Sequence, residues 1–143
     1  MSERSLRAAT AGLAGTGLAV AAYLTWVHYA GVELLCAGGG GACERVQTSA
    51  YAQVLGVPVA LAGLAAYAAL LGCLAVPRRL GRSLGAYVAL TGAGFSAYLT
   101  YIEVAVLHAL CQWCLASAGI MSALAAVAVV RLLRAPPQRS SAA

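Results

Sequence analysis

The feature that most constrains this chain is an almost entirely apolar run of about fifty residues, from position 84 to position 133. As a single helix it would be about 75 Å long, more than twice the roughly 30 Å hydrocarbon thickness of a bilayer. The run therefore has to fold back as two membrane spans. Its midpoint lies near His108, so we expect spans over about residues 84–107 and 113–133, joined by a very short hairpin.

Two further apolar segments precede this run, at about residues 9–29 and 54–76. With 62% hydrophobic and 9% charged residues, against about 25% charged in soluble proteins, the composition is that of a membrane protein. The uncharged stretch over residues 8–32 is too long for the apolar part of a signal peptide, so we expect an uncleaved first span. The sequence predicts an all-α membrane protein, a four-transmembrane-helix bundle over residues 1–134, with a disordered cytoplasmic tail over 135–143.

The basic residues are all arginines and are distributed unevenly along the chain. Those that precede span one, separate spans two and three, or follow span four are Arg4, Arg7, Arg78, Arg79, Arg82, Arg131, Arg134 and Arg139. Because positive loops stay in the cytoplasm, both termini are expected there. The alanine- and glycine-rich composition suggests a bacterium, so the first loop and the hairpin would face the oxidising, periplasmic side of the inner membrane. The arginines form no basic face with interleaved aromatics, which argues against nucleic-acid binding.

Four of the five cysteines gather on the outer side, in two pairs. The first pair, Cys111-Gln112-Trp113-Cys114, opens the fourth span with both sulfurs on one helix face. Exposed N–H groups and the dipole at a helix start favour the thiolate, which is the attacking species in disulfide exchange. A bridge this short would brace a helix very little, so we predict a redox-active pair. A structural bridge and half of a metal site are the alternatives.

The second pair, Cys36 and Cys43, flanks a glycine-rich loop with no side chain larger than a methyl group. Such a loop lets either cysteine swing toward a partner or toward Cys111, and two facing dithiols suggest an electron relay. A static staple of the loop is the alternative. A zinc site of all four cysteines is disfavoured, because structural zinc ligands prefer two to four residues between paired ligands. Cys73, near the inner end of span two, is predicted to be a packing residue.

Three ionisable residues lie near the outer cysteines. Glu103, in span three two turns before Cys111, is costly in a membrane and suggests a role in proton transfer. A protonated or hydrogen-bonded interfacial carboxyl group is the equal alternative. His28 and His108 lie at outer span ends, which fits solvated imidazoles better than haem ligands.

Other residues have simpler interpretations. The aromatic residues fall mostly toward the outer interface and are interpreted as an aromatic belt, comprising Tyr23, Trp26, Tyr29, Tyr51, Tyr98, Tyr101 and Trp113. Small residues recur along the spans and predict close helix packing in lipid, at Gly12, Gly15, Gly17, Gly92 and Gly94. Residues 44–51 are expected to form a short interfacial helix in the first external loop, in which Ser49 would by itself be an ordinary surface hydroxyl.

Together these motifs resemble the bacterial branch of the vitamin K epoxide reductase family. The matching string runs from Cys36 through Cys43-Glu44-Arg45-Val46-Gln47-Thr48-Ser49 and Gly56-Val57-Pro58 to Cys111-Gln112-Trp113-Cys114, and the resemblance covers about residues 25–117. The resemblance implies a bundle around a bound quinone, menaquinone or ubiquinone. It makes Cys111 and Cys114 the active-site pair, with Cys114 nearest the quinone. It makes Cys36 and Cys43 the shuttle pair for a secreted thioredoxin-like (DsbA-like) partner, and Ser49 a hydroxyl beside the active site.

Two departures from the family pattern refine the expected chemistry. Many bacterial members carry a fused thioredoxin-like domain, and this sequence ends too soon for one, so the partner is expected to be a separate protein. Animal members place a tyrosine four residues after the second cysteine of the Cys-x-x-Cys pair, where this chain has Ala118. Simple quinone reduction is therefore favoured over vitamin K epoxide chemistry.

The sequence thus predicts a membrane thiol–disulfide oxidoreductase that supports disulfide formation in exported proteins. A reduced partner would attack the Cys36–Cys43 disulfide, and one loop thiol would then attack Cys111. The alternatives are a DsbB-type oxidase, which would carry its Cys-x-x-Cys in the first loop, a scaffold membrane protein with static disulfides, and a haem electron carrier.

Overall fold

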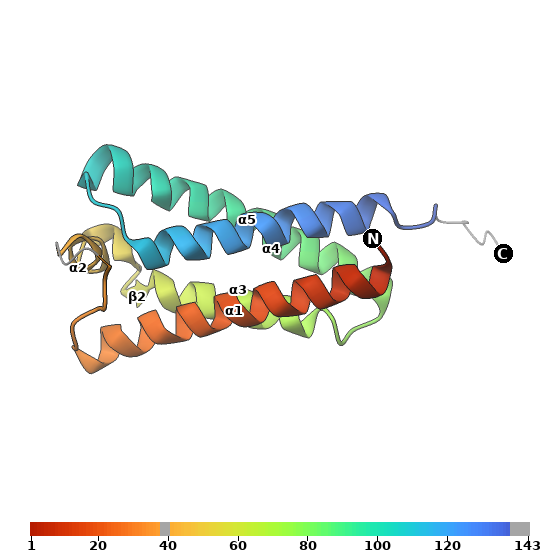
Figure 1. The fold of residues 1–143 in the computed structure, drawn as a ribbon, viewed down its shortest axis with the longest axis horizontal. Coiled ribbons are helices and arrows are strands. Elements are labelled where there is room, and N and C mark those ends of the chain that lie inside the picture. The colour runs from red at the N-terminus through yellow and green to blue at the C-terminus, as the bar shows by residue number, and fades with distance from the viewer. Residues whose placement is uncertain (38–40, 138–143) are drawn as a thin grey trace.

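A computed structural model describes residues 1–37 and 41–137 of the chain. In chain order its elements are α1 (Glu3–Ala30), α2 (Ala42–Gln47), the 3₁₀ turn η1 (Ala50–Ala52), β1 (Gln53–Val54), β2 (Val57–Pro58), α3 (Val59–Gly72), α4 (Arg78–Ile102), the π-helical turn η2 (Glu103–Leu107) and α5 (Gln112–Leu133). The longer helices α1, α3, α4 and α5 run side by side as a bundle, and α2 and the strands gather at one end (Figure 1). The predominantly helical fold is confirmed, with one unpredicted addition, the small antiparallel β1–β2 hairpin.

Local sequence explains three of the helix ends. Ser2 caps α1 by accepting a hydrogen bond from the Ser5 N–H (3.2 Å). Gly31 ends α1 because its φ of 64° is a left-handed conformation that favours glycine. α4 begins directly after Pro77, whose backbone is extended (φ −50°, ψ 138°), several residues before the predicted start of the span at residue 84.

Of residues 54–76, which we expected to form the second span, α3 covers only Val59–Gly72. Leu55 and Gly56 have φ values of 53° and 80° and form the turn of the hairpin that precedes α3. At 14 residues, α3 is about 21 Å long, shorter than a bilayer core. The helix expected over residues 44–51 is likewise interrupted, since α2 ends at Gln47 and η1 follows.

The middle of the bundle is packed through small and large apolar residues. The buried residues of this core are Ala14, Ala21, Tyr67, Leu70, Ala89, Met121, Leu124 and Ala125. A Cβ atom at Gly17 would overlap the ring of Tyr67, and one at Gly92 would lie 2.8 Å from the sulfur of Met121. Close packing through small residues is therefore confirmed at these two glycines. It is wrong for Gly12, Gly15 and Gly94, which face open space.

The start of α1 and the end of α5 lie at the end of the bundle opposite α2 (Figure 1). Near the N-terminus, Glu3 forms ion pairs with Arg82 (3.2 Å) and Arg131 (3.1 Å), and Arg7 donates a hydrogen bond to the Leu74 carbonyl oxygen (2.7 Å). Arginines from three of the predicted clusters therefore meet at one end of the molecule. Of the tail predicted to be disordered, residues 138–143 lie outside the described residues.

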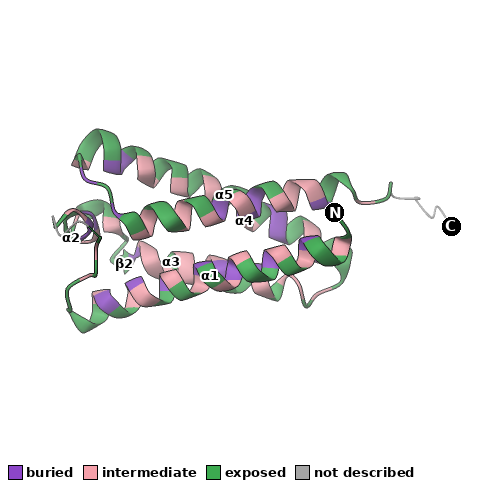
Figure 2. Ribbon diagram, in the orientation of Figure 1, coloured by how far each residue is buried: buried purple, intermediate pink, exposed green. Residues whose placement is uncertain are grey.

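Three helical segments within the described residues are long and apolar enough to cross a membrane, Glu3–Ala30, Arg78–Leu107 and Gln112–Leu133. Much of their outward surface is exposed (Figure 2). On α4 the exposed large hydrophobic side chains include Tyr87, Leu90, Phe95, Tyr98 and Tyr101. Extensive exposed apolar surface of this kind marks contact with a membrane, and the chain is therefore a membrane protein.

Candidate active site

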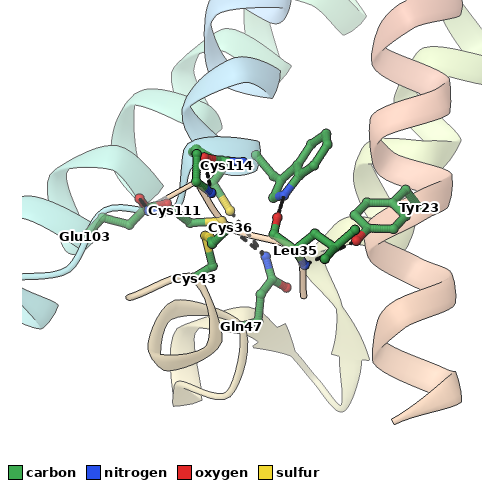
Figure 3. Close-up of a disulfide and its surroundings, with 11 residues drawn as sticks. Tyr23, Leu35, Cys36, Cys43, Gln47, Glu103, Cys111 and Cys114 are labelled. Atoms are coloured by element: carbon green, nitrogen blue, oxygen red, sulfur yellow. Dashed lines mark hydrogen bonds between the residues drawn. A yellow bond between two sulfur atoms is a disulfide. The ribbon is translucent and has the colours of Figure 1, made fainter. Parts of the chain in front are cut away.

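The four cysteines of the two predicted pairs gather in one cluster, between α2 and the start of α5 (Figure 3). Cys36 and Cys43 form a disulfide with their Cα atoms 6.4 Å apart, whereas Cys111 and Cys114 are free thiols. Cys43 and Cys111 are 2% and 0% exposed, and Cys36 and Cys114 pack against them. The fold thus brings together the residues that the sequence named as catalytic candidates.

Cys111 lies immediately before the first turn of α5. Its backbone is extended (φ −93°, ψ 116°), and its carbonyl oxygen accepts a hydrogen bond from the Leu115 N–H (3.0 Å). The hydrogen bond from the Cys114 thiol, the N–H groups of the first helical turn and the Gln47 amide lower the pKa of Cys111 to about 7, although burial acts in the opposite direction. A thiol with this pKa is substantially ionised near neutral pH and can attack a disulfide.

Glu103 holds the turn that leads into Cys111. It begins η2, a single π-helical turn of the kind often found at functional sites, and it is 3% exposed. Its side-chain Oε2 accepts a hydrogen bond from the Cys111 N–H (3.0 Å), and its carbonyl oxygen accepts one from the Ala109 N–H (3.1 Å). The carboxyl group also lies near enough to the Cys114 thiol to interact with it. The sequence singled out Glu103 as ionisable, but its contact with the Cys111 backbone depends on the chain reversal at His108, where φ is 49°.

The loop that carries Cys36 is held by the two middle residues of the Cys-x-x-Cys pair. The indole Nε1–H of Trp113 donates to the Leu35 carbonyl oxygen (2.7 Å). The Ala37 N–H donates to Oε1 of Gln112 (2.9 Å), so the backbone is fixed on both sides of Cys36. Residues 38–40, on which the predicted swing of the cysteines partly depends, lie outside the described residues.

Two residues of the predicted aromatic belt serve this loop instead. The hydroxyl of Tyr23 accepts a hydrogen bond from the Leu35 N–H (3.3 Å), and the Tyr23 and Trp113 ring centroids are 5.0 Å apart. By contrast, Trp26 and Tyr29 are 60% and 67% exposed at the same end of α1, as a belt requires. The sequence could not separate the two kinds, because both occupy the same level of the bundle.

Gln47 is a site residue that the sequence analysis did not single out. It lies one helical turn after Cys43, so both project from the same side of α2. Its Nε2 is 3.3 Å from the sulfur of Cys114 and 3.9 Å from the sulfur of Cys111 (Figure 3). The four-residue spacing from Cys43 was the available signal, but its meaning depended on knowing that α2 packs against α5.

A cavity of about 160 Å³ has Cys114 in its wall. Its apolar lining includes Phe95, Leu99, Ile102, Leu107, Ala118 and Met121. Its polar lining includes Gln47, Ser49, Tyr67 and Ser117. The hydroxyl of Ser49 donates to the Val46 carbonyl oxygen (2.7 Å), which leaves the oxygen lone pairs for a bound molecule. Ser49, which was predicted to lie beside the active site, therefore lines the same cavity as Cys114.

The remaining candidates lie apart from this cavity. His28 contacts Tyr29 edge to face, with ring centroids 5.3 Å apart, and His108 is exposed in the α4–α5 turn. Cys73 ends α3 beside Gly81 of α4, away from the other cysteines. Over residues 1–37 and 41–137, no three His, Cys, Asp or Glu side chains are arranged to hold a metal ion.

Comparisons with known proteins show which family the chain belongs to. Residues 8–129, which include both cysteine pairs, match the model of the vitamin K epoxide reductase family. The chain is also similar to the thiol-disulfide oxidoreductase LTO1 of Arabidopsis thaliana, with 38% identity over 109 residues. That alignment covers 68% of this chain and 29% of the plant protein, so the chain spans less than a third of that relative's length. The chain belongs to the vitamin K epoxide reductase family.

Proposed function

We propose that this protein is a membrane thiol–disulfide oxidoreductase that takes electrons from a separate, exported thioredoxin-like protein and passes them to a quinone. The family and the name of the plant relative support a redox function. The observation that carries the proposal is the shared cluster in which buried Cys43 packs with buried Cys111. Two disulfides with purely structural roles would have no need to share one buried site.

The difference in burial supports distinct roles for the two loop cysteines. Cys36 is partly exposed whereas Cys43 is buried, so the partner thiolate attacks the sulfur of Cys36 and releases Cys43 as a thiolate. Cys43 then attacks the sulfur of Cys111 in a Cys111–Cys114 disulfide. A Cys43–Cys111 bond forms, the Cys111–Cys114 bond breaks, and Cys114 leaves with the electron pair.

Two further exchanges complete the relay. The second partner thiolate attacks its own mixed disulfide, which leaves an oxidised partner and a Cys36 thiolate. Cys36 then attacks the sulfur of Cys43, which re-forms the loop disulfide and releases Cys111, while the two protons of the partner pass to the inner thiols or to water. The product has a Cys36–Cys43 disulfide and a Cys111/Cys114 dithiol, which is the pairing in the structure.

The cavity beside Cys114 fits a quinone, menaquinone or ubiquinone, because its wall is mostly apolar with a few polar groups. A quinone bound there would supply a two-electron, two-proton acceptor. Cys114 would face it from the start of α5, and the Ser49 hydroxyl would lie beside it from the loop. On α3 and α5, Tyr67 and Ser117 form a hydrogen-bonded pair in the same wall (2.8 Å) that would orient a polar ring substituent.

We also infer how the chain lies in the bilayer. α3 and the residues flanking it would make the fourth crossing, since the start of α1 and the end of α5 lie at one end of the bundle and an even number of crossings is then required. The arginine-rich end would be cytoplasmic. The cysteine end would face the periplasm across a bacterial inner membrane, where exported proteins acquire disulfides.

The test is anaerobic quinone reduction by a reduced thioredoxin-like protein, followed by absorbance in proteoliposomes. We expect turnover by the wild type and by the control Cys73→Ala, and loss of turnover in Cys114→Ala. Equal rates for wild type and Cys114→Ala would remove the mechanism. If neither cysteine pair changes its alkylation after addition of the reduced partner, the disulfide is static and the scaffold alternative holds.

A further inference from the structure

Building on the proposed function, we propose that Gln47 is a catalytic residue of the relay. Its side-chain amide stabilises the thiolate that forms on Cys114 when a loop thiol opens the disulfide to Cys111. Neither the family match nor the name of the plant relative assigns a role to this glutamine, and the inference depends on the contact between α2 and α5.

The geometry presents the amide to a reacting atom. Nε2 of Gln47 lies 3.3 Å from the sulfur of Cys114, closer than its 3.9 Å distance from the sulfur of Cys111. An amide nitrogen carries two hydrogens, so it can serve both sulfurs, with the better contact to Cys114. Gln47 also lines the cavity that holds Cys114 in its wall.

The contact becomes stronger as the reaction proceeds. A neutral thiol or disulfide sulfur is a weak hydrogen-bond acceptor, whereas a hydrogen bond to a charged acceptor is roughly twice as strong. The amide therefore favours the state with charge on Cys114 over the disulfide that precedes it. Such differential stabilisation accelerates a step, whereas uniform binding does not.

A neutral donor suits this position better than a cation. The titratable groups around the Cys114 sulfur are Cys111, from the turn before the same helix, and Glu103, from η2. α2 contributes Cys43, which is held in the disulfide with Cys36. A lysine or arginine in place of Gln47 would be drawn into an ion pair with Glu103, but an amide has no charge to pair.

The position of Gln47 on α2 couples the donor to the attacking group. Cys43 and Gln47 are four residues apart on this short helix, and residues at that spacing lie on the same face. When α2 docks with Cys43 against Cys111, it therefore also places the Gln47 amide beside Cys114. Withdrawing α2 removes both, so the thiolate is stabilised only while the loop is docked.

The first measurement isolates the thiol of Cys114. A Cys73→Ala, Cys111→Ala chain keeps the loop disulfide and leaves Cys114 as its free thiol, and its alkylation by N-ethylmaleimide is followed from pH 6 to pH 11. We expect Gln47→Leu to raise the midpoint by about one unit, because a hydrogen bond to a charged group is lost. Gln47→Glu, which keeps the size but replaces donors with acceptors, should raise it further.

A matched control variant and a measurement of the exchange rate complete the experiment. Gln53→Leu makes the same change at an exposed residue of β1 and should leave the midpoint where it is. In the otherwise unaltered full chain, Gln47→Leu should slow the appearance of the inner dithiol after mixing with reduced partner by about tenfold.

The outcomes separate the two proposals. An unchanged midpoint in Gln47→Leu overturns the role of Gln47, even if turnover falls, because the residue would then only hold α2 in place. A wild-type chain that does not oxidise the partner overturns the proposed function, whatever the midpoint. A raised midpoint together with slower exchange supports the catalytic role.

Discussion

The two cysteine pairs differ in how the fold supports them. Cys111 and Cys114 lie at the start of α5, and Glu103 fixes the Cys111 backbone through a 3.0 Å hydrogen bond. Cys36 and Cys43 flank a glycine-rich loop that is held from outside by the side chains of Gln112 and Trp113. The Cys111/Cys114 pair is positioned by α5 itself, and the Cys36/Cys43 pair is positioned by side chains that also belong to α5.

This difference indicates a division of work between the pairs. The loop anchors are a few neutral hydrogen bonds, each with a net contribution of about 1 kcal/mol, so the loop can be released without disturbing the bundle. Moving the start of α5 would instead disrupt a helix that packs against α1 and α4. We therefore expect the loop pair to carry electrons from the surface and the helix pair to stay beside the cavity.

The largest expected effect comes from Cys114→Ala, which removes the group that resolves the exchange between the pairs. Turnover should fall at least about a thousandfold, as for other residues of a catalytic unit. Cys111 should attack Cys43 of the loop disulfide and release Cys36 as a thiol. Alkylation of that thiol before it can attack back should leave a Cys43–Cys111 bond, detectable by mass spectrometry of unreduced peptides. A Cys36–Cys111 bond as the main product would reverse the assigned roles of the two loop cysteines.

A smaller effect is expected at the support of the helix pair. Glu103→Leu leaves the Cys111 N–H without its buried acceptor, a loss of about 1–3 kcal/mol, so the internal exchange should slow by roughly ten- to a hundredfold. Glu103→Gln keeps a carbonyl oxygen and should remain within about threefold of the wild type. Glu33→Leu, at an exposed loop position, is the matched control. Equal losses in the Gln and Leu variants would show that the carboxyl proton matters and the backbone contact does not.

The pH dependence of Cys111 alkylation tests whether its neighbours at the start of α5 lower its pKa. With the pKa of Cys111 lowered to about 7, chiefly by the hydrogen bond from Cys114, its thiolate fraction rises as the pH increases through 7. Alkylation of Cys111, resolved by mass spectrometry, should therefore be about tenfold faster at pH 8 than at pH 6. Cys114→Ala removes the principal cause and should move the midpoint upward, toward the roughly 8.5 of a free cysteine. A midpoint that does not respond to Cys114→Ala would contradict this origin.

Hydropathy and local spacing were sufficient for much of the fold and for the cysteine cluster. They located α1, α4 and α5, because long uncharged runs leave few alternatives to a helix that crosses a bilayer. The three-residue spacing predicted Cys111 and Cys114 on one helix face, but Cys111 lies just before α5 with an extended backbone. The catalytic role of the pair stays a prediction. The break in the chain before α3 could not be predicted, because the residues of the β1–β2 hairpin are as apolar as a helix and the positive φ of Leu55 has no compositional signature.

The supporting contacts of the site could not be predicted because they join distant parts of the chain. Gln47 and Cys114 are 67 positions apart, and Trp113 and Leu35 are 78 apart. Neither contact follows from the spacing of residues within one helix. Both depend on how α2 and the loop before it dock on α5, which is decided by packing of the whole cluster.

The smallest predicted effect concerns the loop anchor and compares two tryptophans. Trp113→Phe keeps an aromatic ring against Tyr23 but removes the indole N–H that donates to the Leu35 carbonyl oxygen. One neutral hydrogen bond of about 1 kcal/mol corresponds to roughly a fivefold shift toward the released loop. Exchange between the two cysteine pairs should slow by up to that factor, and deuterium exchange of the Ala37 N–H should accelerate. Trp26→Phe makes the same change at a residue that is 60% exposed and should alter neither measurement. If both variants behave alike, the loop is held by the disulfide and α2, and the contrast between the two supports is smaller than the geometry indicates.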